Sequence, residues 1–214
     1  MRVRTKKLLQ LGAALTAGGV LVLLTTFAGA ASGQAQHVSW DIVSVSPIPI
    51  APPPPVTFNP GGVASASTPE GATITLTGSG TFVAPAGQNG GSNAVTGGGT
   101  WTVDGGPVRT YVVKELVSWQ FGSPQSLLIG GLPVTDNTGD TTKRANGTAV
   151  LRIKFSDGES GVLTVGCHGP GAPAGIFEGI ATTKGFKTYY NVGGTPPGVP
   201  LPGLNTGRTL FHVG

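Results

Sequence analysis

Glycine and proline occur throughout this chain, and they limit its fold more than any other feature of the sequence. The 214 residues include 37 glycines and 18 prolines, whereas charged residues make up only 10%. A glycine or a proline inside a helix costs about 1 or 3 kcal/mol, respectively. Beyond residue 30 no helix-period segment of useful length is found, so the sequence predicts an all-β protein.

The stretch Gly78–Trp101, GSGTFVAPAGQNGGSNAVTGGGTW, is rich in glycine and has no charged residue. The pattern Gly-x-Gly-Thr-aromatic occurs twice, at Gly78–Phe82 and at Gly97–Trp101. Neither copy matches a nucleotide-binding loop, which needs a Gly-Lys-Ser/Thr ending or a helix that follows the glycines. The stretch therefore predicts a β-hairpin. Its inward-facing glycines mark bends or leave room for a ligand.

Alternating apolar and polar residues predict the other strands, at 37–45, 109–121, 147–168, 174–191 and 208–213. Residues 147–168 predict a hairpin with an Asp-Gly turn at Asp157. Strict alternation over 109–121 places Glu115 on the apolar face and Leu116 on the polar face. About eight strands with hairpin connections predict a single antiparallel β-barrel, with a β-sandwich as the alternative.

Two resemblances accompany this pattern. The segments GSGTF and VTGGGTW resemble strands of the allene-oxide-cyclase and dirigent barrels, which implies a barrel and transfers no functional residue. The segments TAVLRIKFSDG, GVLTVGCHGPGAP and EGIATTKGF resemble exported bacterial β-proteins to which no function is attached. The second resemblance implies export and nothing about chemistry.

The first thirty residues have the layout of a secretory signal peptide, with a basic head, an apolar centre and a small-residue exit. We expect cleavage after Ala30 or after Ala35; an uncleaved membrane anchor is the alternative. The expected domains are a signal peptide (1–30), an N-terminal strand with a proline-rich segment that packs on the main domain (31–71), and a main β domain (72–214). The predicted location is secreted or cell surface, without a membrane contact after cleavage.

Charge and cysteine content narrow the class of partner. Nine basic and nine acidic residues follow Ala30, so the mature chain is close to neutral and a nucleic-acid partner is not expected. The single cysteine, Cys167, cannot form an internal disulfide, and we expect it to be buried and inert. No cofactor is expected.

The residues that could act in catalysis or bind a metal are scattered along the chain. Neighbours in a strand point to opposite faces, so His168 is poorly placed to serve as a base for Cys167. The histidines at positions 37, 168 and 212 lack metal-ligand spacing, and TDNTGD, which begins at Thr135, lacks the acid that completes an EF-hand. We therefore predict no metal site.

Glu115 and Glu178 interrupt apolar strands and are the candidates for acid catalysis. A catalytic carboxyl would border a cleft and have a raised pKa, whereas a structural one would be ion-paired or hydrogen-bonded. The sequence favours the structural role for both, so we predict no catalytic residue and a non-enzymatic protein.

The candidate ligand-binding residues are five aromatic ones: Phe82, Trp101, Trp119, Tyr189 and Tyr190. The sequence thus predicts an exported, non-enzymatic β-protein, with two alternatives. A carrier of a small apolar molecule would have an internal cavity lined by Phe82, Trp101 and Leu151. A polysaccharide-binding module would expose aromatic rings, and one of Tyr189 and Tyr190 is expected outside because they alternate faces.

Overall fold

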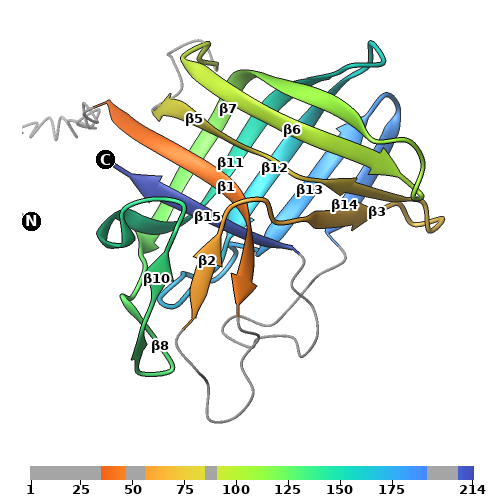
Figure 1. Cartoon of the computed structure of the whole chain (residues 1–214). Helices are drawn as coiled ribbons and strands as arrows, with labels where there is room; N and C mark the ends of the chain where they lie inside the picture. Colours follow the sequence, from red (N-terminus) through yellow and green to blue (C-terminus); the bar gives the residue numbers. More distant parts are fainter. Residues whose placement is uncertain (1–34, 47–55, 85–90, 192–206) are drawn as a thin grey trace, which may run out of the picture. The chain divides into compact units, whose positions relative to one another are not determined.

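The computed structural model describes residues 35–46, 56–84, 91–191 and 207–214 (Figure 1). All of these belong to one compact unit, Gly33–Gly214. The predicted signal peptide, the proline-rich segment 47–55, the loop residues 85–90 and the second proline-rich segment, 192–206, lie outside the described residues. The described part of the chain contains no helix with the length and hydropathy needed to cross a bilayer.

The all-β prediction is confirmed, because the described residues contain strands and a single short 3-10 helix. The strands are β1 (Gln36–Ser46), β2 (Thr57–Asn59), β3 (Ala64–Ser67), β4 (Thr73–Leu76), β5 (Ser79–Ala84), β6 (Val95–Val103), β7 (Arg109–Pro124), β8 (Leu128–Ile129), β9 (Leu132–Pro133), β10 (Thr135–Asp136), β11 (Arg144–Phe155), β12 (Ser160–Cys167), β13 (Gly179–Lys184), β14 (Lys187–Asn191) and β15 (Arg208–Val213), and the 3-10 helix is η1 (Thr141–Lys143).

Thirteen of the described strands form one sheet, and β8 and β9 form a separate pair. The sheet has more strands than the eight or so predicted, partly because β2 and β10 were not predicted. They are only two or three residues long and lie in segments expected to be loops. The predicted strand at 174–191 is a hairpin instead. Its strands, β13 and β14, pair from Lys184 and Lys187 outward, and Gly185, with φ +58°, lies in the tight turn between them.

Some strands of the main sheet form a closed path, in which each strand is hydrogen-bonded to the next and the last is bonded to the first. From β3 it runs through β4, β6, β7, β11, β12, β13 and β14 back to β3, with every pair antiparallel. The predicted hairpin around the glycine-rich stretch consists of β5 and β6, and β6 belongs to this path through its pairing with β4.

A second pair of strands, β1 and β15, joins this path at two places (Figure 1). β1 pairs with β5, and β15 pairs with the first residues of β11, Arg144 and Ala145. From Gly147 onward the partner of β11 is β12. Since Ala145 also pairs with Pro124 of β7, β15 and β12 must share the same edge of β11. They therefore meet at a junction, where a pocket lies.

Two register shifts in β7 correct the predicted faces of Glu115 and Leu116. Leu151 pairs with Leu116 and Val150 with Ser118, so one residue of β7 is extra, and a second shift follows next to it. An extra residue reverses the alternation of side chains beyond it. Leu116 is consequently buried in the core, and Glu115 faces outward.

The glycines of β5 and β6 do not leave empty space for a ligand. A Cβ atom at Gly78 would lie 2.3 Å from the Tyr111 hydroxyl, and one at Gly80 would lie 2.8 Å from Nε1 of Trp40. Gly97, with φ +106°, lies against the backbone of β5, where a Cβ would be 2.2 Å from the Ser79 carbonyl oxygen. These glycines allow two large aromatic side chains and two strand backbones to approach closely.

Candidate functional site

The five aromatic residues predicted to bind a ligand lie in three different environments. Phe82 and Trp119 pack together in the core, with ring centroids 5.3 Å apart. Trp101 and Tyr189 are buried but border a surface groove, which is described below. Tyr190 is 57% exposed while Tyr189 is 2% exposed, so the predicted alternation of faces is present. The structure thus does not bring the five residues together.

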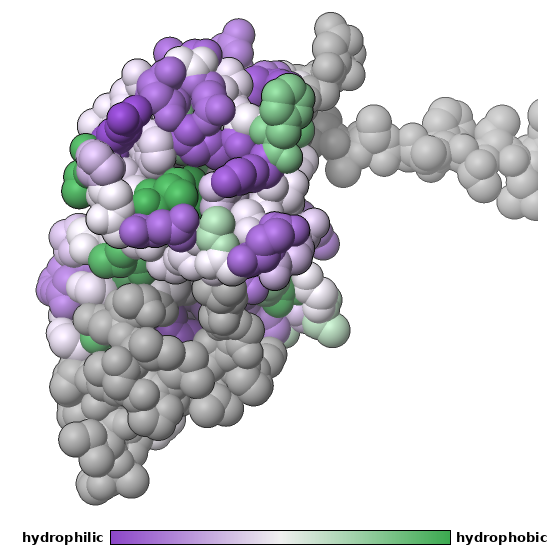
Figure 2. All heavy atoms as spheres, turned by 90° about the vertical axis from the view of Figure 1, so that its right-hand side faces the viewer, coloured by the Kyte–Doolittle hydropathy of each residue, from purple (hydrophilic) through white to green (hydrophobic). Residues whose placement is uncertain are grey.

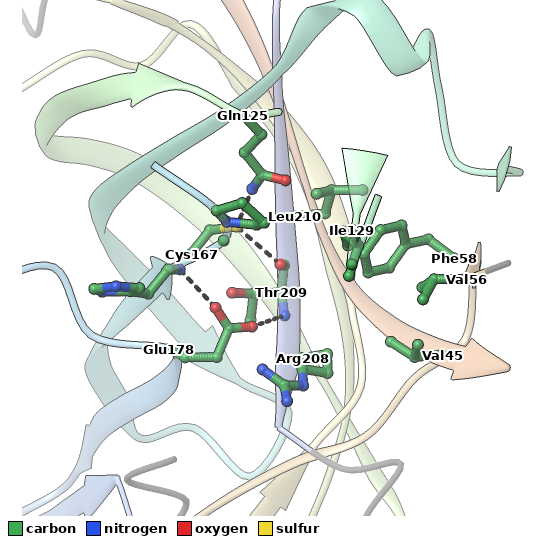
Figure 3. A pocket seen from close by; sticks show the side chains of 14 residues that line it. Val45, Val56, Phe58, Gln125, Ile129, Cys167, Glu178, Arg208, Thr209 and Leu210 are labelled. Carbon is green, nitrogen blue, oxygen red and sulfur yellow. Dashed lines mark hydrogen bonds between the residues drawn. The ribbon is translucent and has the colours of Figure 1, made fainter. Parts of the chain in front are cut away.

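A pocket with chemically varied walls lies at the junction of β15 and β12 (Figure 3). We name it the junction pocket; it is lined by Val45, Val56, Phe58, Gln125, Ile129, Gly130, Cys167, His168, Gly169, Pro170, Glu178, Arg208, Thr209 and Leu210. These residues come from widely separated segments, and none of the predicted ligand-binding residues is among them. Of the residues singled out in the sequence, it contains only Cys167, His168 and Glu178.

One wall of the junction pocket is apolar. Val56 and Phe58, around β2, lie beside Val45 at the end of β1, and Ile129 of β8 and Leu210 of β15 extend this wall (Figure 3). The pocket has a volume of about 190 Å³. An apolar cavity of about 150 Å³ holds one benzene molecule, so the space suits a small molecule.

The opposite wall carries Glu178, whose carboxylate is held by two backbone groups. One oxygen accepts a hydrogen bond from the N–H of His168 at 2.6 Å, and the other accepts one from the N–H of Thr209 at 2.9 Å. Burial raises the pKa of Glu178, although the nearby Arg208 guanidinium and the two N–H groups act in the other direction. Glu178 therefore borders a pocket, and its pKa is raised. Its two carboxylate oxygens also link the residue that follows β12 to β15.

Cys167 is buried next to Glu178 and has two hydrogen-bond partners. Its sulfur accepts from the Gln125 amide at 2.9 Å and donates to the Thr209 carbonyl at 3.0 Å. Burial, together with the negative charge of Glu178, raises the pKa of the Cys167 thiol well above its usual range. A thiol that stays protonated is a poor nucleophile, so this cysteine helps to hold the junction together.

Glu115 lies away from the junction pocket and is part of an exposed ion pair. Its carboxylate is 2.7 Å from Nε of Arg152, the residue opposite it on β11. The register shift in β7 brings the two residues into this cross-strand position. The ion pair is the structural role that the sequence favoured for Glu115.

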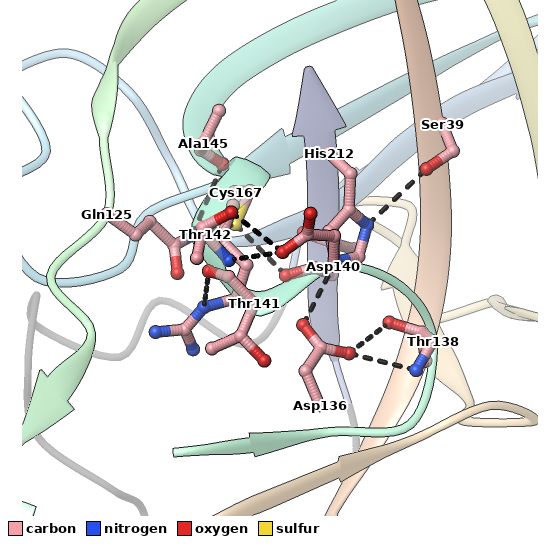
Figure 4. A network of polar contacts seen from close by, with 12 residues as sticks. Ser39, Gln125, Asp136, Thr138, Asp140, Thr141, Thr142, Ala145, Cys167 and His212 are labelled. Carbon is pink, nitrogen blue, oxygen red and sulfur yellow. Dashed lines mark hydrogen bonds and ion pairs between the residues drawn. The ribbon is translucent and has the colours of Figure 1, made fainter. Parts of the chain in front are cut away.

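A second polar cluster joins β1, β10 and β15, and no sequence motif indicated it (Figure 4). His212 lies directly opposite Ser39 in the β1–β15 ladder, and its Nδ1 is 3.4 Å from the Ser39 hydroxyl. Its Nε2 is 3.0 Å from a carboxylate oxygen of Asp136, and both side chains are buried. Gly139 lies close to the imidazole, because a Cβ there would be 2.8 Å from Cε1 of His212.

The serine, histidine and aspartate of this cluster are the residue types of a hydrolytic triad, but the surroundings of Ser39 do not fit acyl transfer. β1 is paired with β5 on one edge and with β15 on the other at this residue. The backbone N–H groups around Ser39 are thereby used in ladders and cannot form an oxyanion hole. None of the three residues lines the junction pocket. The cluster instead fastens the β10 segment to the outer face of β15.

Two further ionisable residues, Asp41 and Arg144, lie near the pair formed by His212 and Asp136. Burial raises the pKa of Asp41 to about 6, and the nearby carboxylate of Asp136 adds to the shift while His212 opposes it. Burial alone would raise the pKa of Asp136 too, but hydrogen bonds from His212 and Thr138 outweigh burial and lower it. Arg144 is buried as well, donates to the Ser126 carbonyl at 2.6 Å and lies over the Phe58 ring.

The TDNTGD segment uses its acidic side chains within the chain. Asp136 accepts hydrogen bonds from Thr138 and contacts His212, and Asp140 accepts two from Thr142 at the start of η1. Among the residues that the structure describes, no group of His, Cys, Asp and Glu side chains could hold a metal ion. Comparisons of the chain with family models, curated proteins and solved structures found no match.

Proposed function

We propose that this protein is an exported, non-enzymatic β-barrel that binds a small, mainly apolar molecule in the junction pocket. The closed path of strand pairs supports a barrel, because an open sheet would leave two unpaired edges. The leader-like first thirty residues support export. The carrier expected from the sequence would hold its ligand among Phe82, Trp101 and Leu151. The present proposal instead puts the ligand at the junction of β15 and β12.

The observation that carries the proposal is the contrast between the two walls of the pocket. Ligand sites are mostly apolar and have a few fixed polar groups that orient the ligand. Here Val56, Phe58 and Leu210 supply apolar surface, and the carboxylate of Glu178 is held in place by backbone hydrogen bonds. A molecule with one ring or a short aliphatic chain and one polar group fits this arrangement.

The chemistry of the pocket favours binding over catalysis. Hydrolysis by paired carboxyl groups needs a second acid close to Glu178, and the described residues that line the pocket include none. The Cys167 thiol is buried and protonated, and both oxygens of Glu178 are occupied by backbone N–H groups. These hydrogen bonds stabilise the junction.

The test is to fill the pocket and follow a bound ligand. Ile129→Trp places a large ring in the pocket, whereas Leu128→Trp places the same ring on the adjacent residue, which is 47% exposed and does not line the pocket. Native mass spectrometry on protein recovered from the producing culture should show a surplus mass in the wild type and in Leu128→Trp. The surplus should be absent from Ile129→Trp.

The same samples supply the outcomes that would contradict the proposal. A surplus mass that persists in Ile129→Trp would place the ligand elsewhere. If the wild type carries no surplus mass and binds neither benzoate nor indole in a titration, the pocket is not a binding site. Denaturing mass spectrometry tests export separately, since only full-length chains, with none shortened near Ala30 or Ala35, would overturn it.

A further inference from the structure

Three hairpin turns surround a groove at the end of the sheet where β6 leads into β7. We name it the hairpin groove; it is lined by Trp101, Val103, Gly106, Pro107, Arg109, Glu159, Lys184, Phe186, Lys187 and Tyr189. Its residues belong to the β6–β7, β11–β12 and β13–β14 hairpins. Its volume is about 520 Å³, within the range of small-ligand sites. None of its residues lines the junction pocket.

The hairpin groove is lined by three basic residues, two of which are paired with carboxylates. Lys184 and Lys187 face each other across the β13–β14 hairpin, and like charges placed opposite each other destabilise a hairpin. Lys184 is compensated, because its ammonium group binds the carboxylates of Asp157 and Glu159. Arg109 is 4.0 Å from Asp157. Within the described residues, Lys187 has no hydrogen-bond or ion-pair partner, so its charge is available to an anion.

Aromatic groups in the groove offer one stacking surface and one hydroxyl. Phe186 is fully exposed in the turn that it shares with Gly185, so its ring has no packing partner among the residues that the structure describes. The Tyr189 ring is buried, but its hydroxyl is neither hydrogen-bonded nor among the buried unpaired atoms of the described residues, so the hydroxyl reaches solvent. Trp101 is already covered, because Lys184 lies 4.6 Å from its ring centre.

We propose that the hairpin groove binds an acidic polysaccharide, with a sugar ring on Phe186 and its carboxylate on Lys187. A uronic-acid unit combines an apolar C–H face, hydroxyl groups and one negative charge, and these match the Phe186 ring, the Tyr189 hydroxyl and the Lys187 ammonium group. A neutral sugar would leave the charge of Lys187 unused.

The groove favours a polysaccharide over an anionic membrane. An anionic membrane is bound by clusters of several free basic residues, whereas in this groove Lys184 is neutralised by Asp157 and Glu159. The surface around this end also lacks a continuous apolar face, because Figure 2 shows small hydrophobic areas separated by hydrophilic residues on the side drawn there.

Affinity gel electrophoresis of the protein through polygalacturonic acid tests the proposal. We expect retardation in polygalacturonic acid and none in dextran. Phe186→Ala and Lys187→Gln should each weaken retention by about three- to tenfold, the range of one aromatic or charged contact. Tyr190→Ala removes an exposed ring from the opposite face of β14, and Lys114→Gln removes an exposed charge from β7. Both controls should bind as the wild type does.

Four results would overturn the proposal. Absence of retardation in polygalacturonic acid would exclude the polymer, and equal loss in the two controls would exclude the groove. Equal retention by poly-L-glutamate would show that charge alone is recognised and that no sugar is needed. Binding to phosphatidylglycerol vesicles without binding to polygalacturonic acid would assign the groove to a membrane instead. None of these results depends on the junction pocket, because the two sites share no residue.

Discussion

At the scale of single residues, polar side chains are buried where β10 covers the outer face of β15. Asp41, Asp136 and His212 lie close together there, and the two carboxyl groups respond differently to burial. Asp136 gains hydrogen bonds from His212 and Thr138, whereas burial outweighs the opposing charge of His212 at Asp41 and raises its pKa. Ionised Asp41 therefore opposes folding, and ionised Asp136 favours it.

Asp41 is expected to make the protein more stable as the pH falls from about 7 towards 4. Its pKa is raised from 3.8 to about 6 in the folded state, so the folded chain binds the proton more readily than the unfolded chain in this window. Asp41→Asn should remove this dependence. Because solvent screens the half-buried carboxyl, we expect Tm near pH 8 to rise by only about 2–4 °C.

Thermal unfolding followed by circular dichroism between about pH 4 and pH 8 measures this effect. Glu70→Gln, a change at an exposed carboxyl in a turn, is the control and should follow the wild-type curve. A profile for Asp41→Asn that parallels the wild type would show that other groups cause the pH dependence.

At the scale of elements, the register of β7 against β11 decides which of its side chains enter the core. Leu116 and Val117 are equally apolar, and strict alternation from Tyr111 would bury Val117. The extra residues in β7 bury Leu116 instead and place Glu115 opposite Arg152. Because of the β-bulges, a leucine side chain lies in the core where strict alternation would place a carboxylate. Substitutions in β7 can measure which side chains are buried.

Leu116→Ala should destabilise the protein by about 2–5 kcal/mol, because it removes a fully buried side chain from a packed core. Val117→Ala should cost about 1 kcal/mol or less, since Val117 is only partly buried. Urea denaturation of the two variants compares the free energies of unfolding. Equal losses, or a larger loss for Val117→Ala, would mean that β7 has no bulge at this place.

At the scale of the whole sheet, closure is the property that separates a barrel from a sandwich. β5 ends one path through the sheet but also pairs with β1, and β3 has a partner on each side. Closure removes the unpaired N–H groups that an edge strand would expose to another chain. It also places β1 and β15 at the junction where the pocket lies.

Hydrogen exchange tests closure directly. If β5 is paired on both edges, the amides of residues 79–84 should be protected to the same extent as those of 149–155 in β11. Deuterium uptake of the two peptides can be compared by mass spectrometry. Immediate exchange of about half the amides in 79–84 would show that β5 has a free edge and that it does not pair with β1.

The class of fold and most of the long strands could be predicted from the sequence without the structure. Alternation and turn residues are local properties, so residues 147–168 show their hairpin and buried face without any other part of the chain. The glycine-rich stretch likewise shows that it forms strands. The sequence also indicated correctly that Tyr189 and Tyr190 lie on opposite faces.

The faces beyond the β7 bulges, the closing pairs and both candidate sites depend on how distant segments meet in the folded chain. Ser39 and His212 meet across 173 positions, and the junction pocket joins segments from Val45 to Leu210. Contacts at such separation leave no periodic trace in the sequence, because each segment is consistent with many partners until the strands pair. The local pattern specifies strands, and the order in which they pair specifies where a ligand can bind.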